Sequence, residues 1–272
     1  MPELPEVETT VRGLRAVLEG RRLTRVELRR QDLRRAFPAD LGQRLTGARV
    51  TALGRRAKYG LVETDRGDTM VFHLGMSGRW RIDPGEIGPH DHLLIATDDG
   101  VLLSLNDPRR FGSVDLVATS ELAEWPPFKA LGPEPLDGAL DGAWLKKRFA
   151  GRTAAVKQLL LDQKVVAGLG NIYVCEALFQ ARIDPRKPAG KVGRTKLDAL
   201  ASAIASVLEA AIEAGGSSLR DFARPDGELG YFSKRFQVYD REGRACGAGC
   251  DGTVKRIVQG GRSTFFCPSC QR

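Results

Sequence analysis

The chain opens with residues 1–20, MPELPEVETTVRGLRAVLEG, and this stretch decides how the fold begins. Apolar side chains recur every three or four residues along it: Val7, Val11, Leu14 and Leu18. This spacing predicts an amphipathic helix over residues 5–19, which Gly20 can end. The helix would hold Pro2 and Glu3 at its N-terminal end.

Pro2 is a candidate nucleophile. An initiator Met is usually removed when proline follows it, and Pro2 would then carry a secondary amine with a pKa of about 7.7–8.0. Such an amine attacks an aldehyde-level carbon and gives an iminium, which draws electrons from neighbouring bonds. The carboxyl group of Glu3 can move the proton that this chemistry requires. The alternative is that Pro2 and Pro5 only start the helix.

Composition sets broad limits on the protein. A chain of 272 residues is long enough for two domains, and 42 Lys and Arg against 34 Asp and Glu leave a net charge of +8. With a sequence pI of 9.4, the chain is suited to a polyanionic partner. Neither a secretory signal nor a membrane span is visible, so we expect a cytosolic protein.

Residues 21–120 have the pattern of strands. The segments richest in β-branched and apolar residues, separated by short turns, are residues 48–53, 60–64, 69–74, 92–97 and 101–105. They predict an antiparallel sandwich or barrel. Between two of them, residues 55–59 (RRAKY) place three cations in four positions, which taken alone favours a solvated face.

Two loops in this region offer large side chains among turn residues. Residues 74–78 (LGMSG) carry Met76, and residues 106–112 (NDPRRFG) carry Phe111. Proteins that distort a DNA duplex use such side chains as wedges between bases. The alternative is that both side chains fold back over the core.

A Pro- and Gly-rich stretch at residues 126–143 predicts a domain boundary. Beyond it the clearest helices are predicted over residues 153–163, 172–181 and 195–214. The glycines of residues 167–171 (AGLGN) could let backbone amides approach a phosphate, or could simply join two helices. Residues 215–232 form a long loop of small residues, typical of a lid or a connector.

Four of the five cysteines lie near the C-terminus: Cys246, Cys250, Cys267 and Cys270. Two close pairs separated by sixteen residues suit a tetrahedral zinc ion, with a ribbon of residues 254–258 and 263–266 turned at Gly260 and Gly261. The fifth, Cys175, lies among apolar residues and is expected to pack in a core.

Six of these motifs occur together, in the same order, in the bacterial formamidopyrimidine-DNA glycosylases. They are MPELPEVE at residues 1–8, RAKY at 56–59, HLGMSG at 73–78, DPRRFG at 107–112, GLGNIY at 168–173 and the four-cysteine ribbon. The chain resembles that family from residue 1 to 272. The first cysteine pair departs from the family pattern, because three residues separate Cys246 and Cys250 where the family usually has two.

The resemblance implies an α+β multidomain fold. It has an N-terminal β-sandwich with flanking helices, a C-terminal helix–two-turn–helix domain and a β-hairpin zinc finger with one structural zinc ion per chain. We expect residues 1–130 to form the catalytic domain and 131–143 a linker. Residues 144–240 would form the helical DNA-binding domain and 241–272 the zinc finger.

The resemblance also implies a monomeric repair enzyme that acts on damaged double-stranded DNA. It would excise oxidised purines such as 8-oxoguanine through a Pro2 Schiff base and cleave the strand by β,δ-elimination. The implied catalytic residues are Pro2, Glu3, Lys58 and Arg262. The implied DNA-binding residues are His73, Met76, His90, Arg109, Phe111, Arg152 and Asn171, with Lys58 and Arg262 also on phosphates.

Within this set, Met76, Arg109 and Phe111 would fill the space left by the flipped base, and the loop 217–231 would close over that base. Two alternatives stay open. One is an endonuclease VIII-like enzyme that acts on oxidised pyrimidines. The other is a zinc-ribbon DNA-binding protein without catalytic activity.

Overall fold

Helix α1 (Leu4–Leu18) confirms the helix that the apolar periodicity predicted over residues 5–19. The predicted apolar face is buried, with Val7, Val11, Leu14 and Leu18 each at most 1% exposed. The helix begins at Glu3, whose side chain accepts the Glu6 amide while the Glu6 carboxylate accepts the Glu3 amide. This reciprocal pair satisfies two backbone donors that a helix N-terminus otherwise leaves open. The N-terminal residues are therefore held in place.

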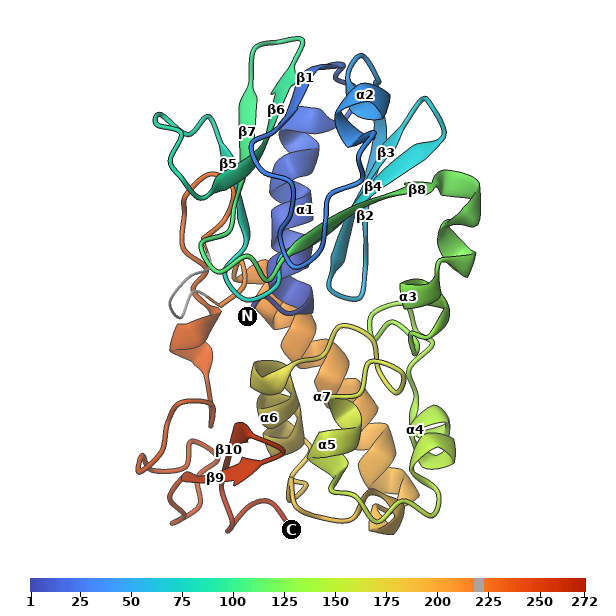
Figure 1. Cartoon of the computed structure of the whole chain (residues 1–272). Coiled ribbons are helices and arrows are strands. Elements are labelled where there is room, and N and C mark those ends of the chain that lie inside the picture. Colours follow the sequence, from blue (N-terminus) through green and yellow to red (C-terminus); the bar gives the residue numbers. More distant parts are fainter. Residues whose placement is uncertain (218–222) are drawn as a thin grey trace. The chain divides into compact units, whose positions relative to one another are not determined.

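Residues 1–217 and 223–272 are described by this computed structural model. They form two compact units, which Figure 1 traces along the chain. The first unit comprises Met1–Lys129 and Ala214–Tyr231, and the second comprises Ala130–Glu213 and Phe232–Arg272. The division into four ranges expected from the sequence stays a prediction.

The first unit is built on two antiparallel sheets of four strands, which form the expected β-sandwich. One sheet has the order β1-β6-β7-β5, with β1 (Leu23–Leu28), β6 (Asp91–Thr97), β7 (Leu102–Asn106) and β5 (Arg79–Ile82). The other has the order β2-β3-β4-β8, with β2 (Val50–Arg56), β3 (Tyr59–Thr64), β4 (Asp68–His73) and β8 (Ser113–Ala118). The short elements α2 (Leu41–Leu45), η1 (Thr119–Glu124) and α3 (Pro126–Lys129) complete the unit.

Five of these strands match the predicted segments, and three were missed: β1, β5 and β8. All three lie at sheet edges. Edge strands carry more charged side chains than central strands, since one side of the strand has no neighbour, so their apolar pattern is weaker. In β5, for example, Arg79 and Arg81 alternate with Trp80 and Ile82.

The core of the first unit packs α1 with the two sheets. Phe72 and Trp80, both nearly fully buried, meet edge to face with ring centroids 5.6 Å apart. A Cβ atom on Gly60 would lie 2.1 Å from the Phe72 ring, so glycine is required at that position. Residues 214–231 join this unit through the bond from the Ile82 amide to the Pro225 carbonyl, at 2.9 Å.

The second unit contains the predicted helices and the predicted ribbon. Its helices are α4 (Gly142–Phe149), α5 (Val156–Leu160), α6 (Asn171–Gln180) and α7 (Arg194–Glu213), with short turns η2 (Ala189–Lys191) and η3 (Phe232–Arg235). Strands β9 (Lys255–Gln259) and β10 (Arg262–Phe266) form the hairpin, which turns at Gly260 and Gly261 as expected. Within residues 1–217 and 223–272, no helix has the length and apolar character that crossing a membrane requires.

Helix α5 ends earlier than predicted, at Leu160 instead of residue 163. The Gln163 side chain explains the difference, because it bonds to the backbone on both sides of the following turn. Its Nε2 donates to the carbonyls of Leu161 and Leu169, and its Oε1 accepts the Gly168 amide at 2.9 Å. These local bonds compete with helical ones and favour the turn.

Candidate active site and metal centre

Pro2 and Glu3 lie at the head of α1 and are buried, with Glu3 2% exposed. The carboxylate of Glu6 holds this end of the chain. Its Oε2 accepts the Glu3 amide at 2.8 Å, and its Oε1 accepts the Ser217 amide at the same distance. Glu6 thus joins the N-terminus to residue 217, a role that the sequence analysis missed. The spacing of Glu3 and Glu6 was the available signal, since it is that of a capping box.

Lys58 lies in the turn between β2 and β3. Residue Ala57 of this turn has φ +52°, a conformation rare for a residue with a side chain and frequent at functional sites. Lys58 is only 8% exposed. The neighbouring Arg55 bonds to Glu8 at 3.1 Å and to the Ala57 carbonyl at 2.9 Å. A solvated face is therefore wrong for this part of the cationic run.

His73 ends strand β4, opposite Tyr59 in the register of β3. Its Nδ1 accepts the Gly75 amide at 3.0 Å, and the Tyr59 ring lies 4.9 Å from the imidazole. Burial lowers the pKa of His73 to about 4, and the nearby cations Lys58, Arg34 and Arg35 act in the same direction. The ring is thus neutral near pH 7.

The loops that carry Met76, Arg109 and Phe111 are both in the first unit. Phe111 is 45% exposed, and the Arg109 guanidinium lies over its ring at 4.8 Å. Met76 is partly buried. The alternative that both loops fold back over the core is therefore wrong for Phe111, which is presented to solvent.

His90 and Arg152 are both exposed, in different units. The His90 ring lies 6.3 Å from that of His92, and its carbonyl accepts the Asp107 amide at 2.9 Å. Arg152 follows α4, where its amide donates to the Phe149 carbonyl and its carbonyl accepts the Gly190 amide, both at 3.0 Å. Their exposure leaves both side chains accessible to a partner.

Asn171 begins helix α6 and is bonded to the zinc-finger hairpin. Its Nδ2 donates to the Ser263 carbonyl at 2.9 Å, which leaves the second amide hydrogen for another acceptor. Lys157 reaches the same strand, donating to the Ser263 carbonyl at 2.9 Å and to Thr264 Oγ1 at 2.6 Å. All three bonds support the residues that follow Arg262, which is exposed at the start of β10.

Lys157 is fully buried, and the sequence analysis did not single it out. A second missed residue is Glu176, which is 3% exposed on α6. Its carboxylate accepts three successive backbone amides at the entrance to the zinc finger, those of Gln237, Val238 and Tyr239, at 2.8–3.0 Å. No local sequence pattern marks either residue, because their partners lie more than 60 positions away.

The four cysteines of the ribbon come together as predicted. Their sulfur atoms all lie within 4.8 Å of one another. The Cys246–Cys270 distance is 3.5 Å, Cys250–Cys267 is 3.7 Å and Cys250–Cys270 is 3.0 Å. Tetrahedral zinc with Zn–S bonds of about 2.3 Å separates its sulfurs by about 3.8 Å, so this group fits one structural zinc ion per chain.

The three-residue spacer of the first pair does not prevent this arrangement. Gly249 takes φ +74°, which lets the chain turn back so that Cys250 faces Cys267. Gln271 supports the second pair: its Oε1 accepts the Cys267 amide, and its Nε2 donates to the Ile183 carbonyl, both at 2.8 Å. Cys175 is buried and packs beside this group in the local core, as expected.

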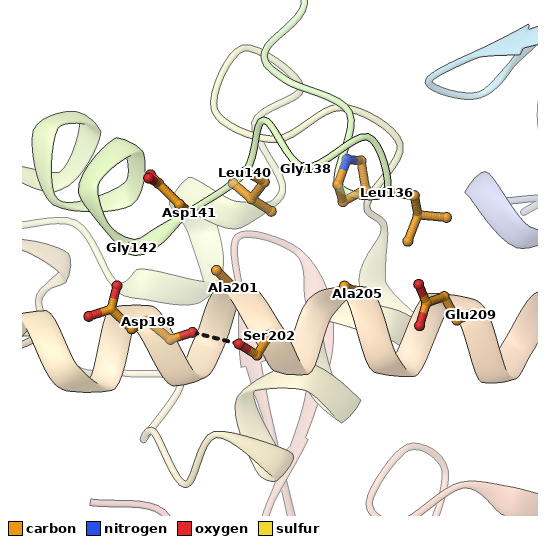
Figure 2. A pocket seen from close by; sticks show the side chains of 11 residues that line it. Leu136, Gly138, Leu140, Asp141, Gly142, Asp198, Ala201, Ser202, Ala205 and Glu209 are labelled. Atoms are coloured by element: carbon orange, nitrogen blue, oxygen red, sulfur yellow. Dashed lines mark hydrogen bonds between the residues drawn. The ribbon is translucent and has the colours of Figure 1, made fainter.

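A groove of about 430 Å³ lies along α7, and Figure 2 shows its lining. Its carboxylates belong to Asp141, Asp198 and Glu209, and its other walls are leucines, a proline and small residues such as Ala201 and Ala205. Carboxylates repel phosphate, so the charge of this lining does not favour binding to a nucleic-acid backbone.

Comparison with known proteins agrees with the geometry of both units. Three family sequence models match the chain. They are the N-terminal domain of formamidopyrimidine-DNA glycosylase over residues 1–114, its H2TH domain over 131–223, and the zinc finger found in FPG and IleRS over 249–272. The chain belongs to the formamidopyrimidine-DNA glycosylase family. The zinc-finger match begins after Cys246 and includes the other three cysteines of the ribbon.

Relatives in this family match the chain over its whole length. The formamidopyrimidine-DNA glycosylases of Rhizorhabdus wittichii and Novosphingobium aromaticivorans are each 68% identical to this chain over 272 residues. Each alignment covers 100% of the relative and 100% of this chain. Among solved structures, Lactococcus lactis Fpg in complex with DNA containing an abasic site has a TM-score of 0.91 at 33% identity, with both chains fully covered. The MutM (FPG) protein of Thermus thermophilus has a TM-score of 0.88 at 39% identity, covering 99% of this chain and 98% of its own.

The family resemblance inferred from six motifs is thus confirmed, and so is the architecture that it implied. The chain has the sandwich, the helix–two-turn–helix domain and the zinc finger of formamidopyrimidine-DNA glycosylases.

Proposed function

We propose that this protein is a bifunctional DNA glycosylase and abasic-site lyase that excises oxidised purines, such as 8-oxoguanine and formamidopyrimidines, in base excision repair. The observation that carries the proposal is the Pro2–Glu3 pair, fixed by a capping box at the head of a buried helix in a chain of this family. Lactococcus lactis Fpg, a relative in structure, is described in complexes with DNA that contains Fapy-dG or an abasic site.

In the proposed reaction, Pro2 acts as a secondary amine after Met1 is removed. Its lone pair forms a bond to C1′ of the damaged nucleotide while the C1′–N bond breaks, and the base leaves with that electron pair and a proton. Loss of the amine proton and opening of the sugar then give the iminium. Glu3 is the proposed group that moves these protons, since it is buried beside Pro2. The iminium acts as the electron sink for β-elimination and then δ-elimination of the strand.

Lys58 is the proposed proton donor for β-elimination and Arg262 the one for δ-elimination. Both are also proposed to bind phosphate, together with His73 and Asn171. The neutral His73 ring has its Nδ1 occupied by the Gly75 amide, so its Nε2–H is the donor that faces a phosphate. Each contact of this kind adds affinity without sequence preference.

Met76, Arg109 and Phe111 are proposed to fill the space that the flipped base leaves in the duplex, with Arg109 contacting the opposite base. The exposed Phe111 ring with the Arg109 guanidinium above it has the form of an apolar wedge with a polar donor. His90 and Arg152 are proposed as further DNA contacts. The proposed cover over the base, residues 217–231, includes residues 218–222, which lie outside the described part of the chain.

Borohydride trapping tests the proposal directly. We expect the N-terminally processed protein to form a covalent adduct with a duplex containing 8-oxoguanine opposite cytosine. The same protein with a blocked N-terminus should bind the duplex but give no adduct, because its Pro2 nitrogen is an amide. An adduct from the blocked protein would exclude Pro2, and no adduct from the processed protein would favour a DNA-binding protein without catalytic activity.

A panel of lesions separates the proposal from the endonuclease VIII-like alternative. Single-turnover excision should be faster on 8-oxoguanine and formamidopyrimidine duplexes than on duplexes with oxidised pyrimidines. The opposite order would favour the alternative. We further propose that the protein is a monomer and acts in the bacterial cytoplasm at the nucleoid. Light scattering should find about the chain mass of 29.7 kDa, and a C-terminal fluorescent fusion should overlap the DNA.

A further inference from the structure

The two loops that carry the proposed void-filling side chains are joined by a buried hydrogen bond. Ser77, on the loop of Met76, donates from Oγ to Oδ1 of Asp107, on the loop of Arg109 and Phe111, at 2.6 Å. Ser77 is 6% exposed and Asp107 is fully buried. The bond therefore forms where water cannot replace it.

Further bonds connect this pair to the middle and the end of the second loop. The Ser77 hydroxyl accepts the Arg109 amide at 3.2 Å, and Asp107 Oδ2 accepts the Gly112 amide at 2.8 Å. A hydroxyl can donate one hydrogen bond and accept others at the same time, so Ser77 serves both contacts. A buried carboxylate is costly unless its oxygens are bonded, and here each oxygen has a donor.

The backbones of the two loops also touch. Gly75 has φ +60°, and a Cβ atom there would lie 2.3 Å from the Phe111 carbonyl carbon and 2.5 Å from the Gly112 nitrogen. A Cβ on Gly112 would lie 2.8 Å from the His73 carbonyl oxygen. The loops thus pack at the closest approach that glycine allows, with no space for one to slide past the other.

We propose that Ser77 and Asp107 are positioning residues that make these two loops one rigid unit, so that Met76, Arg109 and Phe111 enter the duplex together. Neither residue need touch the sugar or the damaged base. Ser77 and Asp107 should speed the step in which the damaged base leaves the stack and Arg109 contacts the opposite base. Loops that are already held in place lose less conformational freedom when they bind DNA. This inference rests on the proposed function and assigns a role to two residues outside its catalytic set.

The test compares Ser77→Ala with the wild type in single-turnover excision of 8-oxoguanine opposite cytosine and opposite adenine. A second substrate carries a preformed abasic site, which has no damaged base to remove from the stack. Removing the hydroxyl should slow excision roughly tenfold, a loss typical of one buried charge-assisted hydrogen bond, and should reduce discrimination between cytosine and adenine. Cleavage of the abasic site should change by less than about threefold, because the groups at the sugar are intact.

Three further variants make the result specific. Ser77→Cys keeps the shape of the side chain but replaces the hydroxyl with a slightly larger thiol that is a weak donor, so it should behave like Ser77→Ala. In a Phe111→Ala background, Ser77→Ala should cost less than it does in the wild type, since one of the three side chains it positions is already gone. Ser202→Ala, an exposed serine on α7, should match the wild type.

The inference is overturned if Ser77→Cys is as active as the wild type, or if Ser77→Ala slows both substrates equally. Additive losses with Phe111→Ala would also overturn it. If Ser77→Ala is unstable, the Cys variant provides the same comparison. An inactive wild type would instead contradict the proposed function, whereas an active wild type with an unaffected Ser77→Ala variant contradicts only this inference.

Discussion

The amide of Gly75 donates a hydrogen bond to Nδ1 of His73 across 3.0 Å. A nitrogen that accepts a hydrogen bond carries no proton, so this contact leaves the proton of the neutral ring on Nε2. The loop that carries Met76 therefore also sets the tautomer of a proposed phosphate ligand.

His73 should titrate well below an ordinary histidine. Burial, aided by Lys58, Arg34 and Arg35, lowers the pKa of His73 to about 4. As the pH falls below about 6.5, the unfolded chain takes up this proton before the folded protein does. His73 therefore lowers the free energy of unfolding as the pH falls from about 6.5 to about 4. Above pH 6.5 it adds no pH dependence. An NMR titration, assigned with His73→Gln, would contradict the prediction if the midpoint were near 6.5.

Arg262 should act on DNA mainly through phosphate. We expect Arg262→Ala to weaken binding to damaged and undamaged duplexes alike and to lower the salt slope of log Kd by roughly one unit, as for one released counterion. Arg25→Ala, an exposed arginine of β1, is the matched control and should leave the slope unchanged. Affinity measured from low to high salt decides the case. An unchanged slope with a lost lesion preference would place Arg262 at a base instead.

Lys157 should stabilise the second unit by holding the zinc-finger hairpin. In Lys157→Met, Thr264 Oγ1 and the Ser263 carbonyl each lose a donor, while the Ser263 carbonyl keeps that of Asn171. The cost is about 1–3 kcal/mol in the free energy of unfolding. Urea unfolding should show this loss, while Lys147→Met, an exposed lysine on α4, should stay within about 0.5 kcal/mol of the wild type. Equal stability of both variants would show that the buried ammonium contributes nothing.

The zinc ion should depend on all four ribbon cysteines and not on Cys175. Elemental analysis should find one zinc per wild-type chain and much less in Cys250→Ser, because four thiolates complete the tetrahedral site. DNA affinity should fall with the metal, while the sheets of the first unit keep their strand signal in circular dichroism. Cys175→Ala should retain the zinc, since that thiol is buried in the core. A fully active protein without zinc would contradict the assignment.

The sequence by itself determined the features that depend on neighbours along the chain. The apolar spacing within residues 5–19 determined the helix that became α1, and the turn residues between β-rich segments determined the central strands. The cysteine spacing determined the zinc site, because two short loops place four sulfurs around one ion whatever surrounds them. The order of six motifs determined the family.

Only the tertiary structure decided which polar side chains hold these parts in place. Glu6 bonds to Ser217 across 211 positions, Lys157 to Thr264 across 107, and Ser77 to Asp107 across 30. Local periodicity predicts whether a residue faces the core. It does not predict which distant donor bonds to which acceptor there. Those pairings arise because the folded chain excludes water from these positions, where a polar group without a partner would cost stability.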